Sequence, residues 1–579
     1  MKLVSLFILF VFVGSVSATV VGWQNNGRGD FPDATPPTSF DGEKGIGVRW
    51  KAKLPNWSNS SPIVVEPADG KGAARVICLA EPLDYSPILL CFDADTGQEL
   101  WRKELDAVAA MPKDVQDEAR ALAKRCWAKQ RAKKAMNVEG WKMYERNKAA
   151  WDARAELRNR GGQGITAEAR KNLPPELEPL VRRAKELDCD FTGIGRSHWS
   201  PDLFQFLRGS VTDNEFKRLN QLGLWWSAWE KDGTWDGIAF ATPVSDGTFV
   251  WTLTAHNLYS CHDVDGRLIW QTRFAPPEAN DVQEKDKERI GDTRKNGWLR
   301  GYHSEAFITA PLWVEGNLIA NAGLYVRCLD AATGKLRWEV PMRGYNSQCV
   351  GVPGVVRVGG EYYILTVGST GRSRDGDEIL RLKDGAVAGL LPGSTASKGS
   401  IVNPMVIVDD RVVNITKEGL TGWKLTEKDG KIVPERLWAT PVDARGLARA
   451  CWSGGFIYSR DGIFDTKDGK KLQGGVRGNG YASDGGIVAG RVTVGWDFYK
   501  GKFYFTDIKT QNNLGEGALP TNAADGLPQQ LKQEQEIGDT WRWLGAATPF
   551  AYKNCLYVRS YDFLWCLSTD TRDAATMVK

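Results

Sequence analysis

The sequence lacks an excess of charge of either sign, because 75 lysines and arginines nearly balance 71 aspartates and glutamates. A net charge of +4 over 579 residues excludes the strongly basic surface that nucleic-acid binding requires. No stretch after the N-terminus reaches eighteen consecutive apolar residues, so the sequence predicts no transmembrane segment.

Cysteine and histidine patterns for metal binding are also missing. The ten cysteines are scattered, with no Cys-x-x-Cys motif, no Cys-x-x-Cys-His motif and no adjacent pair, which excludes a zinc knuckle and covalent haem attachment. Only four histidines are present, and their spacing predicts no metal site. Four cysteines recur at one position of the repeat described below, which favours small packing residues over disulfide pairing: Cys91, Cys261, Cys328 and Cys566.

The N-terminus has the pattern of an export signal. Lys2 precedes an apolar run over residues 3–13, which is too short to span a bilayer, and Val16, Ser17 and Ala18 offer a cleavage site. A retained membrane anchor is the alternative, disfavoured by the polar residues that follow at once. We therefore expect residues 1–18 to be removed and the protein to be periplasmic or secreted, with periplasm and exterior left open.

Glycine and tryptophan are abundant, and they mark a repeat. There are 62 glycines and 24 tryptophans, the latter about three times ordinary usage. The pattern Cys-x-Asp-x-x-Thr-Gly-x-x-x-Trp occupies residues 91–101 and 328–338, and a version one residue shorter occupies 261–270. It predicts a strand, a tight turn with glycine at a positive φ, and a strand whose tryptophan packs on a neighbour.

A second element recurs ahead of each such turn: a small or polar residue, proline and an apolar strand. Together the two elements predict four short strands in about 40 to 50 residues, the period of a propeller blade. Blade starts are expected near residues 59, 240, 307, 350, 401, 447, 485 and 546, which favours eight blades and leaves seven as the alternative. Residues 48–54 are expected to close the ring as the outer strand of the last blade.

The turn-and-tryptophan unit resembles the tryptophan-docking repeat of the propellers named after pyrroloquinoline quinone (PQQ). That superfamily includes quinoprotein alcohol dehydrogenases and the outer-membrane assembly propeller BamB, and residues 22–30 resemble the lead-in of exported bacterial members with no assigned reaction. The resemblance covers residues 45–106 and 237–570. It implies an all-β propeller in which four tryptophans dock blade to blade: Trp101, Trp270, Trp338 and Trp438.

The resemblance also implies what a quinoprotein would need: a flat tryptophan floor, a carboxylate-rich calcium site and an aspartate base. Many members carry adjacent cysteines over the quinone, which this chain lacks, and no flanking motif identifies a catalytic aspartate. The segment Asp375–Glu378 is acidic but lacks the spacing of a calcium loop, which favours a solvated hairpin tip. We therefore predict no cofactor and no metal, and leave the catalytic residues unassigned.

Loops that enter or leave blades three and four carry polar residues that would lie on a propeller face. These are the candidate binding residues, and hydrated loop charges are the alternative interpretation: Arg300, His303, Arg372, Arg374 and Asp375.

Residues 107–236 interrupt the ring with a helical pattern that holds eight tryptophans. Residues 115, 119, 122 and 126 form an apolar stripe, and Thr212–Glu215 is a capping box that begins another helix. We expect these helices either to pack over a face or side of the propeller or to form a lid or partner-binding arm. In both cases we expect the insertion to be separable from the propeller.

The expected organisation is a signal peptide (1–18), a lead-in with the closing strand and blade one (19–106), the helical insertion (107–236), the other blades (237–570) and a tail (571–579). The favoured function is a monomeric, non-enzymatic binding scaffold of the cell envelope. Its partner would be a protein or carbohydrate, held on a propeller face or on the insertion. The alternative is a divergent PQQ- and calcium-dependent alcohol or sugar dehydrogenase.

Overall fold

The computed structural model describes most of the chain, and the account below is confined to that part. The described residues are 20–56, 58–81, 84–146, 179, 182, 186, 195–197, 200–205, 212–224, 238–274, 309–322, 325–341, 352–366, 376–392, 406–408, 410–442, 450–472, 474–476, 486–497, 501–520, 547–560 and 563–570.

The chain is mainly β, and its described strands form five four-stranded sheets, one eight-stranded sheet, one six-stranded sheet and one two-stranded sheet. Taken in sequence order, most strands group into antiparallel sets of four, called units; units 4 and 5 share the eight-stranded sheet, and unit 7 forms the six-stranded sheet with two short N-terminal strands. Unit 1 contains β4 (Ile63–Val65), β5 (Arg75–Ala80), β6 (Ile88–Asp93) and β7 (Glu99–Glu104). Unit 2 contains β10 (Val244–Ser245), β11 (Phe249–Leu253), β12 (Leu258–Asp263) and β13 (Leu268–Arg273). Unit 3 contains β14 (Leu312–Val314), β15 (Asn317–Ala322), β16 (Tyr325–Asp330) and β17 (Leu336–Pro341). Unit 4 contains β18 (Gly354–Val358), β19 (Glu361–Leu365), β20 (Asp377–Arg381) and β21 (Val387–Leu391).

The second half of the chain continues the pattern. Unit 5 contains β22 (Val406–Val408), β23 (Arg411–Thr416), β24 (Gly419–Lys428) and β25 (Lys431–Thr440). Unit 6 contains β26 (Cys451–Ser453), β27 (Phe456–Ser459), β28 (Gly462–Asp465) and β29 (Lys471–Leu472). Unit 7 contains β30 (Gly486–Ala489), β31 (Val492–Asp497), β32 (Lys502–Asp507) and β33 (Asn513–Ala518). Unit 8 contains β34 (Phe550–Tyr552), β35 (Cys555–Arg559), β36 (Phe563–Ser568) and, from the N-terminal end, β3 (Val48–Lys53).

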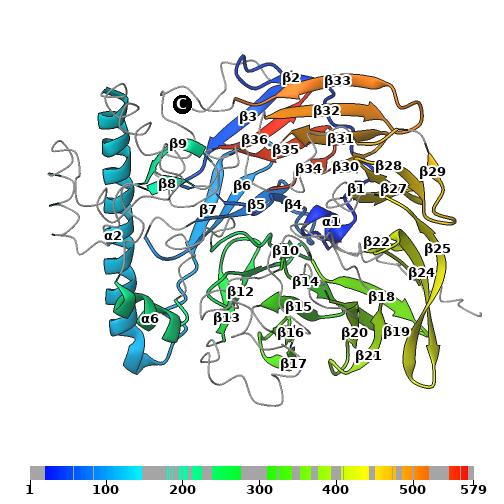
Figure 1. The fold of residues 1–579 in the computed structure, drawn as a ribbon, viewed down its shortest axis with the longest axis horizontal. Helices are drawn as coiled ribbons and strands as arrows, with labels where there is room; N and C mark the ends of the chain where they lie inside the picture. Colours follow the sequence, from blue (N-terminus) through cyan, green and yellow to red (C-terminus); the bar gives the residue numbers. More distant parts are fainter. Residues whose placement is uncertain are drawn as a thin grey trace, which may run out of the picture.

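The units are arranged around a centre in the manner of a propeller (Figure 1). The expected closing strand is confirmed, because β3 pairs antiparallel with β36 and so joins the two ends of the chain. In units 1 to 7, the connections between the first two strands and between the last two strands lie at one end, the turn face; in unit 8 the same end holds the connection between β34 and β35. The second-to-third connections and the passages between units lie at the other end, the loop face.

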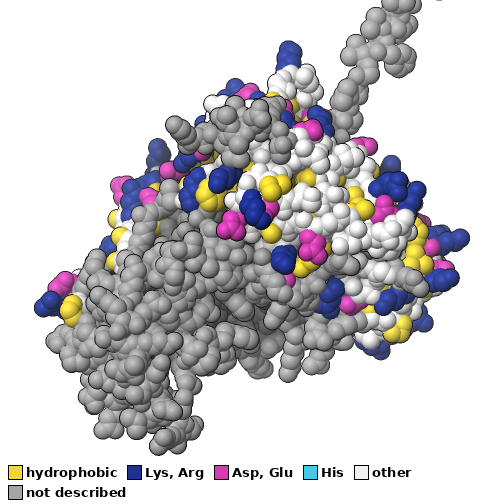
Figure 2. Space-filling model, turned by 90° about the horizontal axis from the view of Figure 1, so that it is seen from above, with side chains coloured by type: hydrophobic (Ala, Val, Ile, Leu, Met, Phe, Trp, Pro, Cys, Tyr) yellow, Lys and Arg dark blue, Asp and Glu magenta, His cyan; other side chains and the backbone are white. Residues whose placement is uncertain are grey.

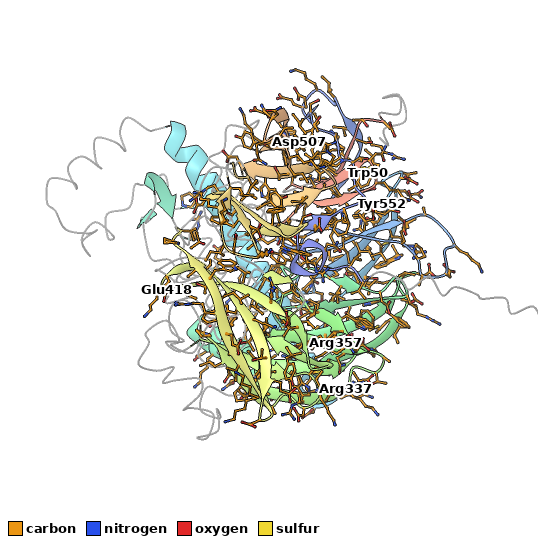
Figure 3. The ribbon with its side chains drawn as sticks, turned by 90° about the vertical axis from the view of Figure 1, so that its right-hand side faces the viewer. Trp50, Arg337, Arg357, Glu418, Asp507 and Tyr552 are labelled. Carbon is orange, nitrogen blue, oxygen red and sulfur yellow. The ribbon has the colours of Figure 1, made fainter. Side chains whose placement is uncertain are left out.

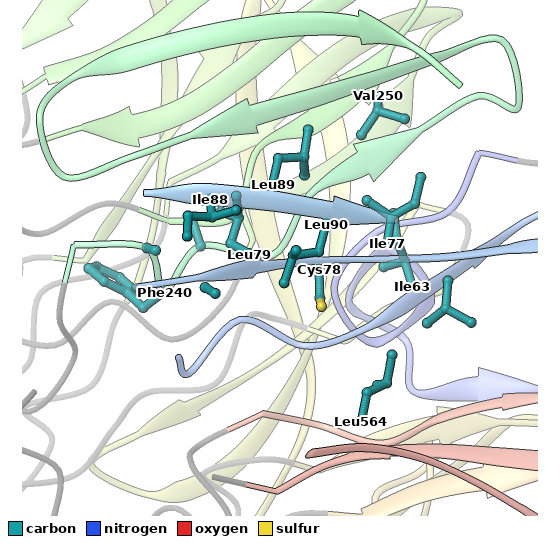
Figure 4. Packing of buried hydrophobic residues seen from close by; sticks show 14 of the residues in the cluster. Ile63, Ile77, Cys78, Leu79, Ile88, Leu89, Leu90, Phe240, Val250 and Leu564 are labelled. Atoms are coloured by element: carbon teal, nitrogen blue, oxygen red, sulfur yellow. The ribbon is translucent and has the colours of Figure 1, made fainter. Parts of the chain in front are cut away.

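The core lies within and between the units. In unit 1, β5 and β6 bury consecutive residues on both faces, as strands covered on two sides must. Figure 4 shows Cys78 among aliphatic side chains of these strands, and its side chain is wholly buried. The recurring cysteines are likewise buried and are free thiols, which is the role of packing residues that the repeat predicts.

The segment before β3 does not belong to any unit. It contains the short helix α1 (Gln24–Gly27), β1 (Asp30–Phe31) and β2 (Phe40–Asp41). Figure 1 shows α1, in dark blue, at the centre of the ring. Both short strands pair in parallel with unit 7, β1 with its first strand and β2 with its last.

The insertion contains α2 (Lys113–Arg146), β8 (Gly195–Ser197), β9 (Ser200–Gln205) and α6 (Asp213–Gln221). The predicted apolar stripe is confirmed, since Ala119, Leu122 and Cys126 are buried. The capping box is also confirmed: the Glu215 amide donates to Thr212 Oγ1 (3.3 Å), and the Thr212 amide donates to Glu215 Oε2 (3.0 Å). Within the described part of the chain, no helix is long and apolar enough to cross a bilayer.

Candidate functional site

The repeated turn is held by its aspartate. In unit 1, Asp93 Oδ1 accepts hydrogen bonds from the amides of Asp95 (2.9 Å) and Thr96 (2.8 Å) and from the Thr96 hydroxyl (2.9 Å). Gly97 follows with φ +74°, which a side chain would disfavour. Asp330 organises the turn of unit 3 in the same way, and its partners Arg337 and Thr333 lower the pKa of this carboxyl to about 2.

A tryptophan from the last strand of one unit lies on the turn of the next. Each indole N–H donates to a turn carbonyl, and the glycine of that turn, where one is present, lies against the ring face. The pairs are Trp50 with Ala94 (2.9 Å), Trp101 with Val264 (3.0 Å), Trp270 with Ala331 (3.0 Å), Trp338 with Leu382 (2.7 Å) and Trp438 with Thr466 (3.1 Å). The four predicted tryptophans therefore lie between neighbouring units.

Trp50 is a fifth such residue, and sequence reasoning missed it. Trp50 belongs to β3, and no Asp-x-x-Thr-Gly turn precedes it in the chain. The sequence around it therefore lacks the pattern that marked the other four tryptophans. The Trp50 ring covers Gly97, where an added Cβ would lie 2.6 Å from Cδ2. Figure 3 labels Trp50 on this closing strand.

Three junctions lack the tryptophan in the described residues, and each is filled differently. Between units 4 and 5, the tryptophan position is Gly389, and β21 pairs directly with β25. Between units 6 and 7, Gln511 replaces the turn glycine, and its side chain occupies the space that a Cβ on Gly474 would enter (2.1 Å). Between units 7 and 8, the N-terminal strand β2 pairs with β33.

The recurring residue before proline links the inner strands. The Thr548 amide of unit 8 donates to Ser61 Oγ of unit 1 (2.8 Å), and the Ser61 amide donates to Thr242 Oγ1 of unit 2 (3.0 Å). All three residues are buried. The hydroxyl of the residue before proline thus accepts a hydrogen bond from the backbone amide of the equivalent residue in the preceding unit. The sequence motif predicted the recurring residue but not this contact.

Charged side chains are buried at the loop face where units 8, 1 and 2 meet. Glu81 Oε1 accepts from the amides of Ile238 (2.8 Å) and Ala239 (2.6 Å), just before β10. Arg559, 1 % exposed, donates to the carbonyls of Leu79 and Asn56, and burial lowers the pKa of its guanidinium. The two charges attract each other, as a buried pair requires.

Asp377 is the most perturbed carboxyl on the loop face. It begins β20 and is partly buried, and burial raises its pKa to about 7. Such a carboxyl would exchange a proton near neutral pH, a property common at functional sites. The sequence favoured a solvated hairpin tip for Asp377. The burial of its carboxyl could not be seen from the sequence.

Most of the other candidate residues fall in parts of the chain that the structure does not describe. Arg300, His303, Arg372, Arg374 and Asp375 lie outside the described residues, as does His198. His256 and His262 lie in the hairpin β11–β12, and burial lowers the pKa of His262 to about 4. Among the described residues, no cluster of three metal-binding side chains is found.

The described residues near the centre of the ring are closely packed. The short helix α1 lies there, and Trp23 and Gln24 at its start are 3 % and 2 % exposed. The carboxylate of Glu81 already binds two amides, and its charge acts on the guanidinium of Arg559.

No family model matches the chain, and no curated protein matches it. Solved structures do: BamB from Moraxella catarrhalis has 11% identity over 57% of this chain and 81% of its own, with a TM-score of 0.34. The quinohemoprotein alcohol dehydrogenase ADHIIG from Pseudomonas putida HK5 has 10% identity over 91% of this chain and 76% of its own, with a TM-score of 0.41. Both similarities lie at low identity and low TM-score, and they assign this chain to no family.

Proposed function

We propose that this chain is an eight-bladed, exported propeller that binds a protein or carbohydrate on its loop face and catalyses no reaction. The carrying observation is the asymmetry of its connections. Many turn-face connections are tight, such as Glu315 and Gly316 between β14 and β15, whereas far more residues separate the last strand of some units from the first strand of the next, as between β13 and β14 and between β33 and β34. Long loops on a rigid scaffold are where binding residues concentrate.

The surface chemistry supports a neutral partner. Figure 2 shows lysines and arginines interspersed with aspartates and glutamates over the described surface in that view. Ion pairs cross many outer strands, for example Arg436 with Glu418 (2.7 Å) and Lys428 with Glu435 (3.0 Å). A surface of alternating sign gives no steering toward a polyanion.

The test is capture from the native envelope fraction with purified full-length protein. Replacing Asp377 by Asn keeps its size while removing its charge, so it should weaken capture if the loop face binds. Lys428→Gln, on an exposed hairpin, is the matched control and should leave capture unchanged. Equal capture by both variants would place binding elsewhere.

The opposing function, a quinone-dependent dehydrogenase, is tested separately. The protein is mixed with PQQ and calcium, desalted, and assayed for retained quinone absorbance and for dye reduction with alcohols and sugars. We expect neither. Stoichiometric retention with turnover would overturn the proposal of a non-catalytic scaffold.

A further inference from the structure

The junctions on both sides of unit 7 have no docking tryptophan in the described residues, yet the ring continues through them. The segment that contacts both is the N-terminal clamp, defined as residues 20–41. It starts at the centre of the ring and ends on the outer strand of unit 7 (Figure 1).

The start of the clamp is fixed on units 2 to 4. Val21 exchanges two backbone hydrogen bonds with Ser245 of β10, both 2.8 Å. Trp23 is 3 % exposed and packs with Leu312 of unit 3 and Val352, which precedes unit 4. The clamp therefore begins with an aromatic anchor on the side of the ring opposite unit 7.

The middle of the clamp joins unit 6 to unit 7. The Arg28 carbonyl accepts from the Trp452 amide of unit 6, and the Gly29 carbonyl accepts from the Val488 amide of unit 7, both at 2.8 Å. Gly29 has φ +64°, and a Cβ there would lie 2.5 Å from Cys451 Cβ. Consecutive residues of the clamp thus bond to the first strands of two neighbouring units.

The end of the clamp joins unit 7 to unit 8. The Phe31 ring meets Phe550 of unit 8 edge-on, with centroids 4.7 Å apart, and the Thr35 amide donates to the Lys553 carbonyl (2.6 Å). Phe40 lies opposite Gly517 of β33, where an added Cβ would be 2.4 Å from its ring. A phenylalanine from the clamp thus covers a glycine of the outer strand of unit 7.

We infer that the N-terminal clamp replaces the tryptophan joints around unit 7, and that the surface beneath it is a binding site for an extended peptide of this sequence. The clamp binds by backbone pairing with sheet edges plus separated aromatic anchors, which is how peptides add to sheets. Its anchors Trp23, Phe31 and Phe40 are 3 %, 6 % and 5 % exposed. The inference is independent of any partner on the loop face.

The first test cuts the clamp after the full chain has folded. Glu43 and Lys44 are exposed in the turn after β2, so a protease site placed there leaves the clamp and the closing strand β3 intact. After cleavage, the released segment should stay with the ring on gel filtration and exchange with labelled synthetic peptide 20–41. A peptide with Trp23, Phe31 and Phe40 all changed to Ala should compete at least about tenfold less well.

A fragment that separates at once from a ring of unchanged Tm would overturn the inference.

The second test needs no cleavage. Gly29→Ala adds a Cβ against Cys451, and Gly70→Ala adds one at almost the same φ (+67°) with no atom within 4 Å. Both variants place a side chain at a similar positive φ, and only Gly29→Ala adds a contact within 4 Å, so the comparison reports chiefly on that contact. Gly29→Ala should lower Tm more and accelerate hydrogen exchange in β26 and β30. Equal Tm values for the two variants would contradict the inference.

Discussion

At the scale of single residues, the contact between neighbouring units depends on the turn glycine that lies against the docking tryptophan ring. Gly334 has φ +69°, and a Cβ there would lie 2.4 Å from the Trp270 ring, while Gly316 in the same unit has φ +71° and open space. Gly334→Ala should therefore destabilise the protein more than Gly316→Ala, because only the first displaces the indole. Thermal unfolding of the two variants measures the difference, and equal losses would mean that backbone strain alone is responsible.

His262 gives a pH-dependent prediction. It is 3 % exposed, and burial lowers its pKa to about 4, with Lys103 acting in the same direction. The unfolded chain takes up this proton near the usual pKa of 6.5, whereas the folded chain does so only near 4, so stability should fall as the pH drops between these values. His262→Phe removes the titration and should flatten the fall in Tm over that range. Parallel profiles for variant and parent would contradict the assignment.

At the scale of elements, the sequence predicted most of what repeats. The Asp-x-x-Thr-Gly turns, the docking positions of Trp101, Trp270, Trp338 and Trp438, and the closing strand all follow from local patterns with a fixed period. Gln511 and Gly389 could not be foreseen as joint positions, because each departs from the pattern and is compensated by a contact specific to that junction. The clamp has no repeat at all, and its contacts join residues hundreds of positions apart.

The helical insertion is more firmly attached than its sequence boundary suggests. Val108, Ala119, Leu122 and Leu219 belong to one buried cluster with the strands of units 1 and 2. Glu215 joins the two helices through Lys129 (2.9 Å) and Arg125 (2.9 Å). Although burial acts to raise it, these cations and the Thr212 amide hold the pKa of Glu215 at about 2.

We therefore expect the separable part of the insertion to be residues 131–211 rather than all of 107–236. The Lys129–Glu215 ion pair brings the two ends of the shorter deletion together, so a short Gly/Ser linker can span them. That variant should keep the parent Tm, whereas removal of 107–236 should lower it by exposing the shared core. Circular dichroism and thermal unfolding decide, and an unchanged Tm for the longer deletion would show that the cluster contributes little.

At the scale of the whole molecule, the ring is closed by one strand, and Trp50 is its joint to the first unit. Trp50 and Trp338 are comparably buried, at 5 % and 8 %, and each donates its indole N–H to the next unit. Replacing either by Ala should cost about 3–5 kcal/mol. The consequences should differ in place, because β3, which carries Trp50, is held in its unit only by pairing with β36 from the other end of the chain, whereas β17, which carries Trp338, is continuous with the other strands of its unit.

Hydrogen exchange under native conditions separates the two cases. In Trp50→Ala, exchange should accelerate in β3, β36 and the strands of unit 1, since β3 loses its contact with unit 1 and no connection along the chain joins it to β36. In Trp338→Ala, the faster exchange should be confined to units 3 and 4, with β3 and β36 as protected as in the parent. If the same strands exchanged faster in both variants, the site at which the ring opens would not depend on which tryptophan is lost. The pairing of β3 with β36 would then contribute no more to stability than other contacts between units.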